Sequence, residues 1–385
     1  MRKIVVAIDS FKGSLSSSEA ACFIERGIQE IYPEVHVLKI PVADGGEGTV
    51  RALTEATNGI EYTDIVSDPL GRPVNATYGV LGDGRTAVIE MASASGLTLV
   101  NESERNPMIT SSYGTGELIL SALKRGCRDF LIGIGGSATN DGGTGMLEAL
   151  GFRFFDKSGN RLKGCGANLS LIKDIDCSGA YPELKDSHFK IACDVTNPFY
   201  GENGAARVFG RQKGATTDMI TQLDEGLKSF AELIRMYKGI DLMSVAGSGA
   251  AGGLGGAFYS FLNVELKSGI DIVLDAINFD ECICGADLIF TGEGRMDAQT
   301  IQGKAPLGIL KRAMKQEIPV IALCGSVRNY ELLNELGFRA VFSIQTEAVS
   351  LEKAMQKEYA GDNLRNTVMQ ILKVRSSGIP VDNRF

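Results

Sequence analysis

A glycine-rich segment near the middle of the chain carries several hydrogen-bonding side chains. Gly133–Gly145 holds six glycines with two threonines, one serine, one asparagine and one aspartate, between an apolar run and a helical pattern. Glycines let backbone N–H groups approach an anion, and a helix start adds partial positive charge. We predict a phosphate-binding turn here, with Asp141 as a candidate metal ligand or proton acceptor. A glycine-rich turn without a ligand is the structural alternative.

Two further polar turns follow the first two predicted strands. Asp9–Ser14 offers an acid, two hydroxyls and a lysine, and Asp44–Thr49 offers two acids among glycines. Ligands bind at the carboxyl ends of strands in open parallel sheets, so both turns should face one pocket. The candidate substrate-binding residues are Asp9, Ser10, Lys12, Asp44, Gly45, Gly46 and Glu47.

A third group combines acids and bases after a late predicted strand. Glu293, Arg295, Asp297 and Lys304 are expected near the same sheet edge as Asp9. Phosphoryl transfer needs such a mixture, because cations and metal ligands neutralise the transferring group while a carboxylate orients the hydroxyl. A structural ion-pair network is the alternative.

Other motifs carry weaker signals. Asp194 also follows an apolar run, and the basic residues of Gly201–Gly214 fit either phosphate oxygens or an exposed loop. Gly247–Gly256 contains a G-x-G-x-x-G match, but close packing of a helix start explains it equally well. No P-loop, protein-kinase or G-x-S-x-G motif occurs in the sequence.

Composition narrows the classes of protein. The chain has 385 residues, a net charge of −8 and no long basic run, so we expect no nucleic-acid partner. No apolar stretch reaches the ~18 residues that a membrane-spanning helix needs, so no membrane partner is expected. Eight scattered cysteines without a C-x-x-C pair indicate reduced thiols in a cytoplasmic protein. With only two histidines, the chemistry must depend on other side chains.

Alternating strand and helix patterns at both chain ends predict a parallel sheet. Between them, shorter alternating runs predict antiparallel strands, followed by helix-rich segments. We therefore predict an α/β fold with two domains. Residues 1–64 and 286–385 form a discontinuous, doubly wound, Rossmann/flavodoxin-like domain, and 65–285 form a second α/β domain inserted into it. The active site is expected in the cleft between the domains.

Motifs along nearly the whole chain closely resemble the bacterial glycerate kinases of the glycerate 2-kinase family. They are Asp9–Ser14, Ala43–Thr49, Asp68–Gly71, Glu90–Leu97, Thr110–Glu117, Ile134–Gly143, Ala192–Pro198, Gly204–Ala206, Gln212–Ala215 and Thr291–Thr300. The resemblance implies an ATP-dependent kinase that needs Mg²⁺ and converts D-glycerate to 2-phosphoglycerate. It also implies one α/β domain inserted in another.

The resemblance suggests roles for the candidate residues. ATP phosphates are expected at Gly135, Gly136, Ser137, Thr139, Asn140 and Gly142. Asp194 or Asp297 would orient the glycerate hydroxyl, and Arg295 and Lys304 would stabilise the transferring charge or bind the glycerate carboxylate. The candidate metal ligands are Asp141, Asp194 and Glu293. A homodimer is a further expectation.

Three alternative functions stay open at this stage. A glycerate kinase could form 3-phosphoglycerate instead, and an NAD-dependent hydroxy-acid dehydrogenase could use the same fold. A non-catalytic glycerate-binding protein would bind the ligand without turnover. The poorly placed ribose-binding acid after Gly247–Gly252 disfavours the dehydrogenase, and the many carboxylates at strand ends disfavour a simple anion-binding protein.

Overall fold

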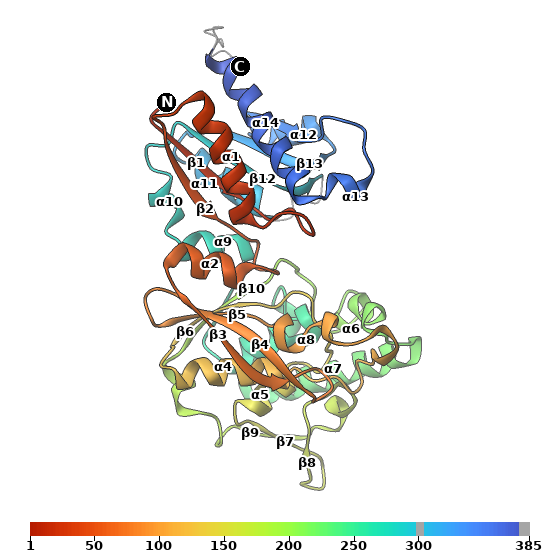
Figure 1. The fold of residues 1–385 in the computed structure, drawn as a ribbon. Coiled ribbons are helices and arrows are strands. Elements are labelled where there is room, and N and C mark those ends of the chain that lie inside the picture. Colours follow the sequence, from red (N-terminus) through yellow and green to blue (C-terminus); the bar gives the residue numbers. More distant parts are fainter. Residues whose placement is uncertain (298–303, 377–385) are drawn as a thin grey trace. The chain divides into compact units, whose positions relative to one another are not determined.

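The computed structural model describes residues 1–297 and 304–376, so part of the motif Thr291–Thr300 and the C-terminal tail lie outside the described residues. The chain divides into two compact units, 1–44 with 273–385 and 45–272. Each unit has its own sheet (Figure 1). Within the described residues, no helix combines the length and apolar character needed to cross a membrane.

The first unit is built on a parallel sheet of five strands in the order β14-β13-β12-β1-β2. Its strands are β1 (Lys3–Ile8), β2 (His36–Pro41), β12 (Leu288–Met296), β13 (Val320–Val327) and β14 (Ala340–Ser343). Its helices are α1 (Ser17–Ile31), α10 (Phe279–Cys282), α11 (Ala305–Met314), α12 (Tyr330–Glu335), α13 (Leu351–Ala354) and α14 (Lys357–Ser376), while α9 (Gly269–Ala276) crosses the boundary between the units.

Helices cover both faces of this sheet. Ile4, Val6 and Ile8 of β1 are fully buried in one core with α1 and α14, as alternation along a strand requires. Helix α11 contacts β1, β12 and β13, and its buried residues lie outside that core. Helix α1 begins with a reciprocal capping box between Ser16 and Glu19. The doubly wound α/β class is confirmed.

The second unit contains a mixed sheet of six strands in the order β11-β10-β6-β5-β4-β3. Its strands are β3 (Ile60–Ser67), β4 (Pro73–Val80), β5 (Thr86–Glu90), β6 (Asp129–Gly133), β10 (His188–Ala192) and β11 (Val264–Lys267), and a small second sheet comprises β7 (Arg153–Phe155), β8 (Arg161–Leu162) and β9 (Asp174–Asp176). Its helices are α2 (Thr49–Thr57), α3 (Ala92–Ser95), α4 (Tyr113–Lys124), α5 (Thr144–Ala149), α6 (Ala205–Phe209), α7 (Thr217–Lys238) and α8 (Ala250–Phe261). The pairs β3–β4 and β4–β5 are antiparallel, whereas β5, β6, β10 and β11 run parallel.

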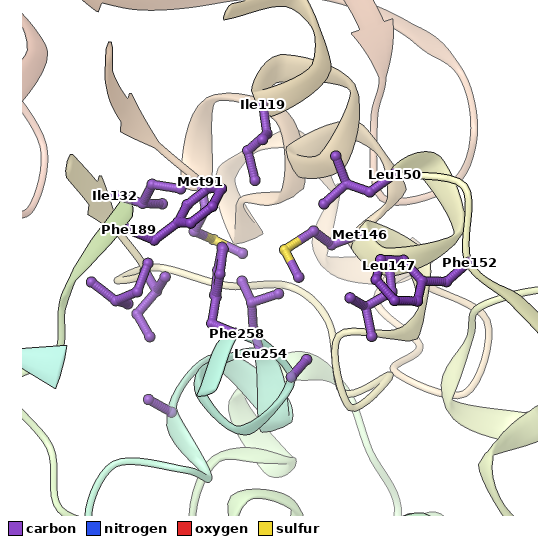
Figure 2. Close-up of a cluster of buried hydrophobic side chains, with 14 of the residues drawn as sticks. Met91, Ile119, Ile132, Met146, Leu147, Leu150, Phe152, Phe189, Leu254 and Phe258 are labelled. Carbon is purple, nitrogen blue, oxygen red and sulfur yellow. The ribbon is translucent and has the colours of Figure 1, made fainter. Parts of the chain in front are cut away.

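The core of the second unit joins its central strands to α5 and α8. Figure 2 shows Ile132 of β6 and Phe189 of β10 near Met146 of α5 and Phe258 of α8. These side chains are at most 1% exposed. Burying a large apolar side chain contributes about 1.5–3 kcal/mol, so this cluster holds α5 and α8 close to the strands.

The observed division differs from the predicted boundaries at 64/65 and 285/286. Strand β3 pairs with β4 along its whole length, and α2 contacts both strands, so residues 45–64 belong to the second unit. At the other boundary, Arg312 of α11 forms ion pairs with Asp275 and Asp280 at 2.6 and 2.7 Å, which links residues after 272 to the first unit.

One predicted turn is strand in the structure. The segment after Phe290 stays paired with β13, with Arg295 opposite Ser326 and Met296 opposite Val327. Strand β12 therefore continues beyond its apolar residues, and the charged residues of this motif lie at its carboxyl end.

The turn before α2 lies against the ends of the central strands of the second unit. A Cβ on Gly133 would lie 2.1 Å from the Gly45 carbonyl oxygen, and a Cβ on Gly45 would lie 2.8 Å from Ala192 Cβ. Gly45 also has a φ of 89°, which favours glycine. The close approach of this turn to β6 and β10 therefore requires glycine at both positions.

We predict that Gly133→Ala destabilises the second unit, because the new methyl group would overlap the Gly45 carbonyl. Such overpacking typically costs about 1–3 kcal/mol of unfolding free energy. Gly135→Ala is the matched control, since no atom lies within 4 Å of its added Cβ. Denaturant unfolding followed by circular dichroism measures the difference, and equal stability of the two variants would contradict the packing described.

Candidate active site

Acidic residues of the first unit gather where β1, β2 and β12 end. Asp9 directly follows β1, Asp44 lies beyond β2, and Glu293 lies near the end of β12. The Asp9 amide donates a hydrogen bond to the Gly292 carbonyl at 2.9 Å, which ties the turn after β1 to β12. The predicted meeting of these residues at one edge is therefore observed for Asp9, Asp44 and Glu293.

Asp9 has an unusual environment for a carboxylate. It is 6% exposed, and its pKa is raised from 3.8 to about 7, mainly by burial and also by the charges of Asp44 and Glu293. A hydrogen bond from the Ser10 amide and the charge of Lys12 act in the opposite direction. Asp9 can therefore exchange a proton near neutral pH, as a general base or acid requires.

Two ion pairs lie beside this acidic group. Lys304 Nζ is 3.2 Å from Glu293 Oε2, and Arg295 Nε is 3.0 Å from Asp297 Oδ2. Glu293 is buried, whereas Arg295 is exposed. A buried carboxylate held beside a lysine at a strand end fits both an ion-pair network and a site for a transferring phosphoryl group.

In the second unit, only part of the glycine-rich segment faces solvent. Gly135 and Gly136 are exposed, and Gly136 has a φ of 73°. The other candidate phosphate-binding residues are buried: Ser137, Thr139, Asn140 and Gly142. The turn directly after β6 is therefore the part of the segment that a ligand can reach in this conformation.

Asp141 fixes the rest of the segment from inside. It is fully buried, and Oδ2 accepts hydrogen bonds from the Ser112 amide at 2.7 Å, from the Ser112 hydroxyl at 2.8 Å and from the Gly145 amide at 3.2 Å. Oδ1 accepts one from the Gly143 amide at 3.0 Å, and Ser112 Oγ accepts one from the Met146 amide at 2.9 Å.

These bonds change two expectations from the sequence. The first amides of α5 are occupied by Asp141 and Ser112, so the anion is not expected at the start of this short helix. The oxygens of Asp141 are committed to internal donors, so the structure gives it a structural role instead of the predicted metal-ligand role. Sequence reasoning missed Ser112 because a serine before a helix usually caps that helix.

The Gly45–Gly48 turn and Glu90 form another part of the second unit's edge. Glu90 ends β5, and its Oε1 accepts a hydrogen bond from the Val50 amide at 2.9 Å. Gly48, at the start of α2, provides no side-chain cap, so the Glu90 carboxylate performs that function from another strand. Glu47 is exposed beside this turn. An acid at the end of an apolar strand is the signal that could have identified Glu90.

Asp194 belongs to the same edge. It is exposed just beyond β10, and its Oδ1 accepts a hydrogen bond from the Gly269 amide at 2.9 Å, at the start of α9. The carboxylate is therefore held close to the strand ends by a backbone donor.

The G-x-G-x-x-G match has a packing role. The Gly142 amide donates to the Gly252 carbonyl at 3.0 Å, and a Cβ on Gly252 would lie 2.1 Å from the Thr139 carbonyl oxygen. Ala251 and Gly252 have positive φ values of 52° and 71° inside α8. The motif therefore packs directly against the glycine-rich segment and supports it.

Two sets of candidate residues result. The first unit holds Asp9, Ser10, Lys12, Asp44, Glu293, Arg295, Asp297 and Lys304, and the second holds Gly45, Gly46, Glu47, Asp194 and the glycine-rich segment. Within the described residues, no group of three or more His, Cys, Asp or Glu residues could hold a metal ion.

Parallel α/β sheets with acidic and glycine-rich turns at their carboxyl edges are typical of enzymes that bind small ligands. Comparison with known proteins gives the class directly. A model of the glycerate kinase family matches residues 4–376, and the chain belongs to this family. It is an enzyme of a kinase family, which implies ATP as the phosphoryl donor.

Individual relatives are similar over almost their full lengths. The chain is 50% identical to the Glycerate 2-kinase of Escherichia coli (strain K12), covering 94% of this chain and 95% of that protein. It is 49% identical to the Glycerate kinase of Bacillus subtilis (strain 168), with 96% of each covered. A solved structure from Salmonella typhimurium LT2, provisionally named glycerate kinase 2, has a TM-score of 0.90 at 47% identity and covers 98% of this chain and 99% of that one.

We predict that Asp9→Asn becomes increasingly more stable than the unchanged protein as pH rises from about 4 to about 8. The folded protein keeps the Asp9 proton up to about pH 7, whereas the unfolded chain releases it near 3.8, so ionisation costs stability above that value. The difference between the Asp9 pKa values of the folded and unfolded protein corresponds to at most about 4 kcal/mol of unfolding free energy. Asparagine keeps the acceptor for the Ser10 amide.

Thermal unfolding across this pH range measures the effect, with Asp186→Asn as an exposed control. A constant difference between Asp9→Asn and the unchanged protein would show that Asp9 ionises normally.

Proposed function

We propose that the protein transfers the γ-phosphoryl group of ATP to the C2 hydroxyl of D-glycerate, giving 2-phosphoglycerate and ADP. The hydroxyl oxygen forms the new bond to phosphorus while the bond to the β-phosphate oxygen breaks. The hydroxyl proton passes to a carboxylate. The similarity to the Glycerate 2-kinase over 94% of this chain carries this proposal.

The chemistry of the first unit supports it. Asp9, with a pKa of about 7, can accept the proton, and Lys12 supplies positive charge from the same turn. Arg295 and Lys304 stabilise the transferring charge or bind the glycerate carboxylate. Phosphoryl transfer depends mainly on positioning and charge, so fixed strand-end residues suit it.

Residues of the second unit complete the proposal. The exposed Gly135 and Gly136 offer backbone donors to ATP phosphates. The Gly45–Glu47 turn is the second unit's candidate for contacting glycerate, and Ser10 and Asp44 are the first unit's candidates. Asp194 or Asp297 orients the glycerate hydroxyl.

Mg²⁺ fits this set through one or two carboxylates and the phosphate oxygens of ATP, a usual arrangement for kinases. Asp194 and Glu293 are the candidate ligands, because both carboxylates lie at strand ends. Asp141 does not fit, since its oxygens accept internal hydrogen bonds. When bound, Mg²⁺ neutralises charge on the phosphates.

The direct test follows ADP release from purified protein with Mg-ATP and D-glycerate and identifies the product by ³¹P NMR. We expect ADP and 2-phosphoglycerate in equal amounts. Formation of 3-phosphoglycerate would overturn the proposed position of transfer, and absence of glycerate-dependent ADP release from folded protein would overturn the proposed reaction.

We predict that Asp194→Asn or Asp297→Asn lowers kcat at least ~100-fold, since a positioned catalytic carboxylate typically contributes that much. Asp186→Asn, an exposed aspartate outside the proposed site, is the matched control and should keep normal turnover. Near-normal kcat in both site variants would show that neither carboxylate orients the hydroxyl.

A further inference from the structure

A buried lysine lies behind the exposed turn of the glycine-rich segment. Lys213 ends the short 3₁₀ helix η5 (Arg211–Lys213) and is 2% exposed. Its Nζ donates hydrogen bonds to Ser137 Oγ at 3.0 Å and to the Thr139 carbonyl at 2.6 Å. The Thr139 amide in turn donates to Ser137 Oγ at 3.1 Å. One ammonium group thus joins the two ends of Ser137–Thr139.

The ammonium group of this lysine has one charged neighbour that acts on it, Asp141, but forms no ion pair with it among the described residues. Buried lysines are normally paired, yet Lys213 makes no ion pair with any residue that the structure describes. Asp141 is the charged group that acts on it, and the oxygens of Asp141 already accept hydrogen bonds from Ser112, Gly143 and Gly145. Neutral side chains could bind Ser137 and Thr139 equally well, so these contacts do not explain a cation.

The other charged residues on η5 and on the adjacent helix α6 have other partners or face solvent. Arg207 of α6, which packs against η5, pairs with Asp224 of α7 at 3.2 Å, and Arg211 of η5 is exposed. Next to Thr139, Asn140 is fully buried, and neither polar atom of its side chain has a hydrogen-bond partner within the described residues. A buried cation and an unsatisfied amide therefore occupy the same segment as the exposed Gly135–Gly136 turn.

We propose that Lys213 is the positioning residue of the nucleotide-binding turn, holding Ser137 and Thr139 so that Gly135 and Gly136 present their amides to a phosphate group. Its charge stabilises the bound phosphate from inside the protein. This inference rests on the proposed function, in which that turn binds ATP.

A second consequence concerns protons. Desolvation lowers the pKa of Lys213 from 10.5 to about 7, against the opposing charge of Asp141, so the side chain is largely neutral at pH 8 before a ligand binds. A nearby phosphate favours the charged form. Nucleotide binding at pH 8 should therefore take up a proton through Lys213.

The experiment measures binding of the non-hydrolysable analogue AMP-PNP with saturating Mg²⁺ at pH 8 by titration calorimetry. Repeating it in buffers of different ionisation enthalpy gives the number of protons taken up. The variants are Lys213→Met, Lys213→Gln, which keeps hydrogen-bonding capacity without charge, and Lys213→Arg, which keeps charge at all pH values. Lys228→Met, on the exposed face of α7, is the control.

We expect Lys213→Met and Lys213→Gln to bind the analogue at least about tenfold more weakly, since a charge-assisted contact is lost. Lys213→Arg should restore part of the affinity but take up no proton, and the KM for D-glycerate should stay within about twofold in all variants. If Lys213 only stabilised the fold, its replacement would change the stability of the protein. Affinity for AMP-PNP and proton uptake would then not differ from one variant to another in this way.

The outcomes separate this inference from the proposed function. If the unchanged protein and both uncharged variants bind AMP-PNP equally and take up equal numbers of protons, the inference is overturned. If binding depends on Lys213 but no glycerate-dependent ADP release occurs, the proposed reaction alone fails. If the unchanged protein binds no nucleotide, both fail.

Discussion

Parallel pairing of strands is the constraint on which both sets of candidate residues depend. Strands that run in one direction end at one edge, so the turns that follow them must meet whatever their distance in sequence. In the first unit this places Asp9 beside Glu293, almost three hundred residues later. In the second unit it brings the ends of β5, β6 and β10 to one edge, and the turn at Gly45 packs against the last two of these ends. Polar side chains from distant parts of the sequence are thereby brought together at one edge of each sheet.

Buried charge then decides what these edges can do. A charge removed from water must be paired, or its protonation must shift. Asp141 is satisfied by internal donors and becomes a fixed part of the scaffold. Burial raises the pKa of Asp141 as well, against these donors. Asp9 and Lys213 have fewer internal hydrogen-bond partners, and the pKa of each moves to about 7. Buried charged groups that the fold compensates only in part are the ones best suited to bind a ligand or to exchange a proton.

The sequence predicted the sheet of the first unit well, because its apolar strands and the capping box at Ser16 are local signals. It also identified the segments that carry Asp9, Asp44 and Glu293, although Glu293 lies within β12 and not in a turn. It could not predict that Asp141 points inward or that Lys213 is buried, because both depend on packing between distant segments. The predicted boundary at 64/65 divides β3, because only its pairing with β4 along its whole length shows that all of it belongs to the second unit.

The account's central claim is that strand-end turns of both units bind the two substrates. Hydrogen–deuterium exchange of the full chain, free and with D-glycerate, Mg²⁺ and AMP-PNP, tests it most directly. We expect slower exchange in 9–14 and 44–48 and in 133–139, with little change at β7 and β9. Protection confined to one unit, or absent from these turns while both ligands are bound, would contradict the claim.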